Sequence, residues 1–270
     1  MHNNSEKSRL MPTEIVRHQT PEEVELLRKR EELAAVRADL AERELELADL
    51  RAQLKSFEGR YLREVGVLYA ELDEWEARIA ELEASYDANP ATKQRATQAR
   101  ERANSSHDAT HGEASNEKEF QPSADIRSLF RDIAKRIHPD FAKDVADQHR
   151  RTRLMARANE AYSRGDVEAL QRILDEFKND PESIEGEDIG SELIRIIRQI
   201  AQAKAHIAAI AKEILQLQES ETAKLRNDVE AAAQVGRDLL AELSAAISEQ
   251  VAQSKKQYED KILEARTSGR

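Results

Sequence analysis

The tripeptide His138-Pro139-Asp140 places an imidazole, a rigid ring and a carboxylate in consecutive positions. Such groups could form an acid–base pair, bind a metal ion or make polar contacts with a partner protein. The other closely spaced histidines, His107 and His111, lie in a stretch with no expected helix. The chain has no cysteine, which excludes thiol nucleophiles and Cys-ligated metals. We therefore expect no catalytic residue, no metal site and no cofactor, and we favour contact with a partner protein.

A basic amphipathic helix is predicted to precede this tripeptide, from about Ser123 to Ile137. Ser123 is a natural N-cap residue. The helix must end at His138, because a proline disfavours helical geometry in the residue before it. The apolar residues share one face of the helix: Ile126, Phe130, Ile133 and Ile137. The basic residues lie on other faces, and the first three are spaced four apart and form one ridge: Arg127, Arg131, Lys135 and Arg136. The tripeptide thus opens a tight, exposed loop.

Two further helices are predicted after this loop. The first runs from about His149 to Ser163 and has one apolar face, made of Leu154, Met155, Ala158 and Tyr162. Gly165 is a good C-terminal stop for it. A short third helix follows, with its apolar residues at Val167, Leu170, Ile173, Leu174 and Phe177. Residues 123–178 therefore form a small helical module.

This module resembles the J-domain family of DnaJ-type co-chaperones. The resemblance rests on the basic helix IRSLFRDIAKRI, the His-Pro-Asp tripeptide, the loop after it, and the helix that ends in Asn159-Glu160-Ala161-Tyr162. It covers about 50 of the 270 residues. J-domains usually begin with a short helix that carries aromatic and leucine residues. Here only Phe120 is large and apolar in that region, so no such helix is recognisable, and residues 167–177 or a coiled-coil arm would complete the hairpin.

The resemblance implies a co-chaperone that docks on a DnaK-type chaperone and stimulates its ATP hydrolysis. Carried over residue by residue, Arg127, Arg131, Lys135 and Arg136 would meet an acidic surface of the partner. The three residues His138, Pro139 and Asp140 would engage the partner's ATPase domain and linker. The chain itself has no Gly-rich phosphate-binding loop with a lysine, so we expect no enzymatic activity of its own.

Two long arms with heptad spacing flank the module. In residues 21–88, one apolar column repeats every seven residues, at Leu26, Leu33, Leu40, Leu47, Leu54, Tyr61, Leu68, Trp75 and Leu82. In residues 191–265, apolar residues alternate by three and four from Leu193 to Leu217, and a four-residue stutter follows. Sustained heptads are typical of coiled coils. The sequence leaves open whether the arms pair with each other or with another copy of the chain.

The remaining segments are polar and poor in large apolar groups. We expect a disordered tail at residues 1–20, a flexible linker at 89–122 and a shorter linker at 179–190. The predicted fold is therefore all-α, with two long coiled-coil arms that flank a small J-like module.

Charge and hydropathy limit the possible partners. The net charge is −11, whereas Ser123 to Gly165 contain ten Lys and Arg against six Asp and Glu. A basic module in an acidic chain favours an acidic partner protein and makes nucleic acid an unlikely one. No stretch resembles a secretory signal or a membrane span, so we expect a cytoplasmic protein. The alternative function is a structural coiled-coil scaffold in which the J-like module is degenerate.

Overall fold

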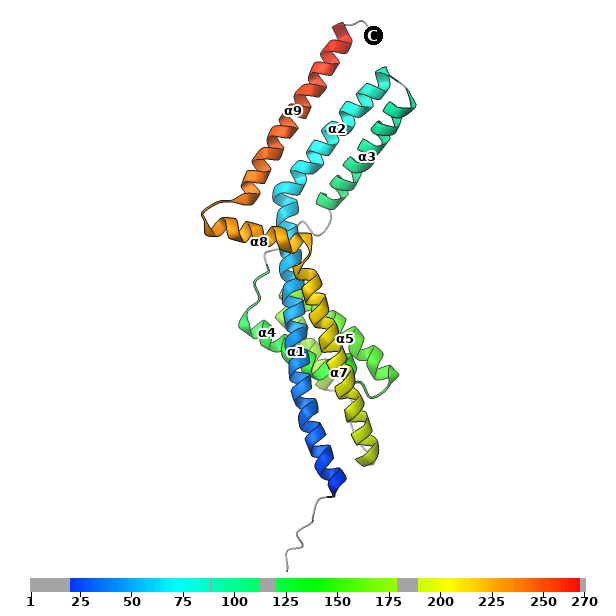
Figure 1. Cartoon of the computed structure of the whole chain (residues 1–270), viewed down its shortest axis with the longest axis vertical. Coiled ribbons are helices and arrows are strands. Elements are labelled where there is room, and N and C mark those ends of the chain that lie inside the picture. The colour runs from blue at the N-terminus through cyan, green and yellow to red at the C-terminus, as the bar shows by residue number, and fades with distance from the viewer. Residues whose placement is uncertain (1–19, 88, 112–119, 179–188, 268–270) are drawn as a thin grey trace, which may run out of the picture.

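A computed structural model describes residues 20–87, 89–111, 120–178 and 189–267 of the chain. The described residues form helices and connecting turns and contain no strand, which confirms the predicted all-α class. The helices build a long, rod-like molecule, with the small module beside the middle of the rod (Figure 1). The predicted tail at residues 1–20, apart from Thr20, lies outside the described residues, and so does most of the linker at 179–190.

The first arm is one helical rod with a local change of winding. Helix α1 spans Pro21–Tyr61 and begins with a capping box, in which Glu23 N donates to Thr20 Oγ1 and Thr20 N donates to Glu23 Oε2. A π-helical turn, η1, follows at Leu62–Gly66, and helix α2 continues over Val67–Tyr86. Each heptad leucine of α1 is buried, as the column predicted: Leu26, Leu33, Leu40, Leu47 and Leu54.

A helix occupies most of the region predicted to be a flexible linker. Helix α3 spans Pro90–His111, so the prediction of a linker over 89–122 is wrong for these residues. Small residues seven apart, Ala96, Ala103 and Thr110, are buried, which lets α3 lie close against α2. Arg100 and Arg102 add ion pairs to the carboxylates of α2. Packing of small residues and charge pairing thus replace the large apolar groups that this segment lacks.

The second arm is divided into three helices. Helix α7 spans Ile189–Gln218, α8 spans Glu221–Gln234 and α9 spans Leu239–Thr267. The first break falls at the predicted stutter, where Ser220 Oγ accepts a hydrogen bond from Ala223 N and caps α8. The second break contains Gly236, whose φ of 77° lies in the left-handed region. Helix α8 crosses the long axis and carries the chain from α7 to α9 (Figure 1).

The two arms pack against each other within one chain. Helix α1 lies along α7, and α2 lies between α3 and α9 (Figure 1). The seam of α1 and α7 buries the leucines of one helix against the isoleucines of the other, including Ile196, Ile200, Ile210 and Ile214. A second cluster joins Phe57, Val65 and Leu72 to residues of α8 and α9.

The module packs on the side of α1 at the middle of the rod. It consists of α4 (Ala124–Ile137), a 3₁₀ turn η3 (Pro139–Phe141), α5 (Val145–Arg164) and α6 (Val167–Lys178). Its core contains Phe130, Ile133, Tyr162, Leu170 and Ile173, each at most 1 % exposed. None of the described helices of the molecule combines the length and apolarity that a membrane crossing requires.

Candidate functional site

Helix α4 and the turn after it form as their residue types require. Ser123 Oγ accepts a hydrogen bond from Ile126 N at 3.3 Å and caps the helix. The last helical residue is Ile137, and His138 has the extended backbone that Pro139 imposes on the residue before it. Asp140 N donates to His138 Nδ1 at 3.1 Å, which closes the His-Pro-Asp turn on itself. The turn is therefore held in one shape by both the proline and the histidine.

A buried charge pair fixes this turn to α5. Arg151 Nε donates to Asp147 Oδ2 at 2.8 Å, and the same guanidinium donates to the carbonyl of Arg136 at the end of α4. Asp147 also accepts a hydrogen bond from Lys143 N in the loop. Sequence reasoning missed both residues. The signal that could have found them is their i, i+4 spacing on a face of α5 that turns toward the loop.

Helix α1 completes the core of the module. Ala41 and Leu45 are buried in the same cluster as Phe130 and Tyr162. Phe120, in the non-helical segment before α4, also packs against that cluster. Tyr162 donates its hydroxyl hydrogen to Asp49 Oδ1 of α1 at 2.6 Å. Burial, together with this carboxylate, raises the pKa of Tyr162 above its ordinary value. Residues of α1 therefore complete the module core, to which α6 contributes Leu170 and Ile173.

The His-Pro-Asp turn is covered by the two arms, so the expectation of an exposed loop is wrong. The side chain of His138 is 1 % exposed, and its Nε2 lies 3.1 Å from Glu44 Oε1 of α1. Asp140 Oδ2 lies 3.0 Å from His206 Nδ1 of α7. The two imidazole rings meet edge to face, with 4.9 Å between their centroids. Four titratable side chains thus form one cluster: Glu44 from α1, His138 and Asp140 from the His-Pro-Asp turn, and His206 from α7.

The charges in this cluster support one another. The hydrogen bond to Asp140 raises the pKa of His206, and Glu44 adds to this effect, although burial of the ring opposes it. Burial alone would raise the pKa of Asp140, but His206 and His138 outweigh it and hold that pKa below its ordinary value. The cluster therefore favours a carboxylate at Asp140 and an imidazolium at His206, which attract each other across the contact between module and arm.

The basic ridge of α4 is divided between the arm and solvent. Arg127 pairs with Asp49 at 3.4 Å, and Arg131 pairs with Glu42 at 3.1 Å. Lys135 and Arg136 are exposed and line a groove of about 1030 Å³ between the module, α1 and α7. The predicted ridge is thus real, but its first two arginines contact the chain's own acidic helix. Pro139, the remaining predicted residue, is half-buried at the start of the 3₁₀ turn η3.

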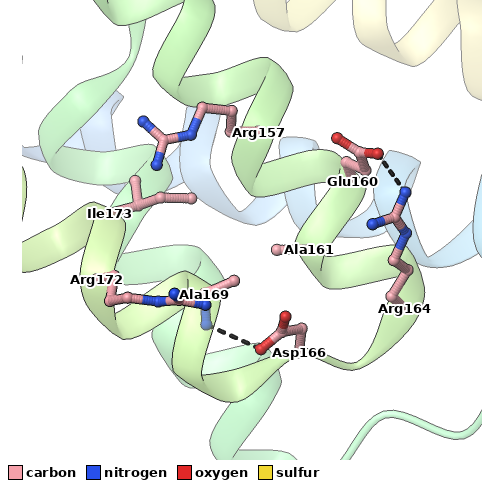
Figure 2. A pocket seen from close by; sticks show the side chains of 8 residues that line it. All are labelled: Arg157, Glu160, Ala161, Arg164, Asp166, Ala169, Arg172 and Ile173. Atoms are coloured by element: carbon pink, nitrogen blue, oxygen red, sulfur yellow. Dashed lines mark hydrogen bonds and ion pairs between the residues drawn. The ribbon is translucent and has the colours of Figure 1, made fainter.

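A second, smaller hollow lies at the turn between α5 and α6, with a volume of about 240 Å³. Figure 2 shows its arginines on both helices, with Arg164 directed toward Glu160. Arg157 pairs with Glu176, and Arg172 Nε donates to the carbonyl of Glu168. Because the chain itself supplies partners for these arginines, this hollow is a less suitable ligand site than the contact around His138.

Comparison of the chain with protein-family models, with curated proteins and with solved structures finds no match.

Proposed function

We propose that this chain is a J-domain-type co-chaperone that docks on a DnaK-type chaperone and stimulates its ATP hydrolysis. One observation carries the proposal: a basic helix ends in a His-Pro-Asp turn and packs against a second helix that carries Asn-Glu-Ala-Tyr near its C-terminal end. Ala41 and Leu45 of α1 are buried in the module core, and in this proposal they take the place of the first helix that the sequence does not show. The family resemblance implies the activity, and the hairpin of α4 and α5 provides the surface that would contact the chaperone.

In this proposal the partner contacts the exposed end of the ridge first. Lys135 and Arg136 steer an acidic surface toward the module, since long-range attraction between opposite charges speeds encounter. His138 and Asp140 are held by Glu44 and His206, so they reach the partner only after the module separates from the arms. The conformation described here is then the covered state of the co-chaperone.

The arms serve oligomerisation or targeting in the same proposal. Their outward faces carry several large apolar side chains that are more than half exposed: Ile194, Leu215 and Leu263. A second copy of the chain or a client could contact such positions. The proposal places the protein in the cytoplasm, where DnaK-type chaperones meet their co-chaperones.

The test is single-turnover ATP hydrolysis by a DnaK-type chaperone, with the full chain added. Glu44→Ala removes the acceptor that holds His138, so we expect faster hydrolysis with this variant than with the wild type. Glu46→Ala is the matched control, because Glu46 lies on the same helix and pairs with Arg43 of its own helix rather than with the module. Addition of His138→Gln to Glu44→Ala should abolish the stimulation.

Two outcomes would contradict the proposal. If neither the wild type nor Glu44→Ala stimulates hydrolysis, the chain is not an active co-chaperone. If the double variant stimulates as strongly as Glu44→Ala, the effect does not pass through the His-Pro-Asp turn.

The second candidate function is a structural scaffold in which the turn fastens the module to the arms. The burial of His138, with contacts at both ring nitrogens, favours it. It predicts that His138→Gln lowers the free energy of unfolding while chaperone hydrolysis is unaffected by any variant. Light scattering should then show an elongated oligomer, and a monomer at all concentrations would contradict assembly through the arms.

A further inference from the structure

Three metal-ligating side chains converge at the contact between module and arms. Glu44 comes from α1, His138 from the end of α4, and His206 from α7, and one ligand atom of each lies within 4.8 Å of the other two. Glu44 Oε1 is 3.1 Å from His138 Nε2 and 3.7 Å from His206 Nε2. Tetrahedral zinc with bonds of about 2.0–2.1 Å separates neighbouring ligand atoms by about 3.4 Å. The two observed distances fall on either side of that value.

Asp140 stands behind both histidines. Its Oδ2 atom is 3.0 Å from His206 Nδ1 and 3.6 Å from His138 Nδ1. Histidines that bind a metal through Nε2 usually donate the Nδ1 hydrogen to a carboxylate, which fixes the ring and strengthens the ligand. His206 already has this arrangement. A single carboxylate is thus placed to orient both imidazoles toward the side of Glu44.

The protons in the site can rearrange to admit a metal. Asp140 N donates to His138 Nδ1, so in this geometry Nδ1 is the acceptor and the Nε2 hydrogen points toward Glu44 Oε1 at 3.1 Å. Metal binding at Nε2 moves this hydrogen to Nδ1, where Asp140 Oδ2 accepts it in place of the bond from Asp140 N, and the His206 imidazolium releases its Nε2 hydrogen to solvent so that both rings bind as neutral ligands.

Charge and access also suit a divalent cation. The side chains of Glu44 and Asp140 are 12 % and 19 % exposed, and a divalent ion can supply the positive charge that these poorly solvated carboxylates favour, in place of the His206 imidazolium. The side chain of His206 is 37 % exposed, so the site is open to solvent on the α7 side. Two imidazoles and one carboxylate are a ligand set that zinc accepts.

We propose that Glu44, His138 and His206 form a binding site for a divalent transition-metal ion of the zinc class, with Asp140 as the carboxylate that orients the histidines. The sequence predicted no metal site, because the ligands are 94 and 68 positions apart along the chain and no local motif joins them. They meet only when the module lies on both arms. A bound metal would therefore fasten the His-Pro-Asp turn in its covered state, since metal binding energy adds to the stability of the arrangement that holds it.

The competing site in the described chain is the pair His107 and His111, one turn apart on α3 and stacked at 4.0 Å between ring centroids. Two exposed histidines on a helix can chelate a metal weakly, so this pair is the matched control. The double variant His107→Ala/His111→Ala removes it and leaves the proposed site intact.

The experiment is titration of the full chain with Co²⁺, followed by visible absorption, and with Zn²⁺, followed by calorimetry. We expect one tight equivalent with the intense absorption of a tetrahedral cobalt site in the wild type and in the α3 double variant. His206→Ala and Glu44→Gln should lose it, and Asp140→Asn should weaken it by about 10–100-fold, the usual effect of removing a carboxylate behind a ligand. Glu44→Gln keeps the side-chain shape and an acceptor for His138, so it guards against loss of folding.

Hydrogen exchange gives the second measurement. Zn²⁺ should slow exchange in α4 and in the middle of α7 in the wild type but not in His206→Ala. Tight binding that survives both His206→Ala and Glu44→Gln, or that disappears in the α3 double variant, would overturn the proposal. So would the absence of any tight equivalent. The site does not depend on the co-chaperone proposal, because metal binding is measured without any chaperone present.

Discussion

The contribution of helix α1 to the core of the module can be tested with one substitution. Leu45 is 5 % exposed and lies in the module core with Phe130 and Tyr162. Leu33, three turns earlier on the same helix, is 6 % exposed and lies in the seam with α7. Leu45→Ala and Leu33→Ala are therefore the same chemical change, at the same burial, on two faces of one helix.

The cost of Leu45→Ala follows from its burial. The change removes three carbon atoms from the core, worth about 0.8 kcal/mol each, or about 2.4 kcal/mol in total. Any cavity that remains adds to this, and measured Leu→Ala changes in cores cost about 2–5 kcal/mol. Since about 1.4 kcal/mol is a factor of ten, the module should separate from α1 at least about 50-fold more often.

Hydrogen exchange resolved along the chain is the assay. In Leu45→Ala we expect the slowest amides of α4 and α5 to exchange about 50-fold faster or more, while those of α7 change less. Leu33→Ala should show the opposite pattern. If Leu45→Ala left exchange in α4 and α5 unchanged, or if both variants accelerated the same amides equally, α1 would not be part of the module core.

Three further predictions concern single residues of the module. Tyr162→Phe removes the hydroxyl that donates to Asp49, and it should lower the free energy of unfolding in urea by about 1.5–3 kcal/mol, as for bonds to charged groups; no loss would mean that this bond is not made in solution. Burial alone would raise the pKa of Asp147, but its hydrogen bonds with Arg150, Arg151 and the loop outweigh it and lower that pKa. The Asp147 carboxylate therefore stabilises the fold at pH values above the ordinary carboxyl pKa, and this contribution is lost as the pH falls through the lowered pKa. The free energy of unfolding should consequently fall more steeply in acid for the wild type than for Asp147→Asn. Gly165 has a φ of 69°, and Gly165→Ala should cost about 1–2 kcal/mol in thermal unfolding, because an L side chain strains the left-handed region; an unchanged melting temperature would contradict that conformation.

Local structure of the module could be predicted from the sequence because short-range rules determine it. The cap at Ser123, the helix end before Pro139 and the stop at Gly165 each depend on residues within a few positions of one another. The heptad leucines of α1 and the break near Ser220 follow from periodicity alone. These features need no knowledge of which helices pack together.

Helix α3 does not follow from the pattern of large apolar residues, because its buried positions are small. Ala96, Ala103 and Thr110 recur every seven residues, which is a heptad column of small side chains. Such a column lets two backbones approach closely, and Arg100 then reaches the acidic face of α2. The spacing was present in the sequence, but small residues also occur in segments without structure, so the pattern alone did not distinguish the two.

The covering of the His-Pro-Asp turn could not be predicted, for a different reason. His138 contacts Glu44 and Asp140 contacts His206, and these pairs are 94 and 66 positions apart. Before the fold is known, Glu44 is one of many acidic residues on a heptad helix. Only the docking of the module on both arms distinguishes it from its neighbours.

Helix α1 is synthesised before the helices that pack against it. Its seam partner α7 ends at Gln218, and the module that buries Leu45 ends at Lys178. At synthesis rates of about 5–20 residues per second, the 117 residues from the end of α1 to the end of α6 take about 6–23 seconds, and the 157 residues to the end of α7 take about 8–31 seconds. During that interval two apolar faces of one long helix are open to the nascent chains of neighbouring ribosomes on the same message. The order of helices along the gene thus sets a window in which α1 of one copy can pair with α1 of another, before its own chain can compete.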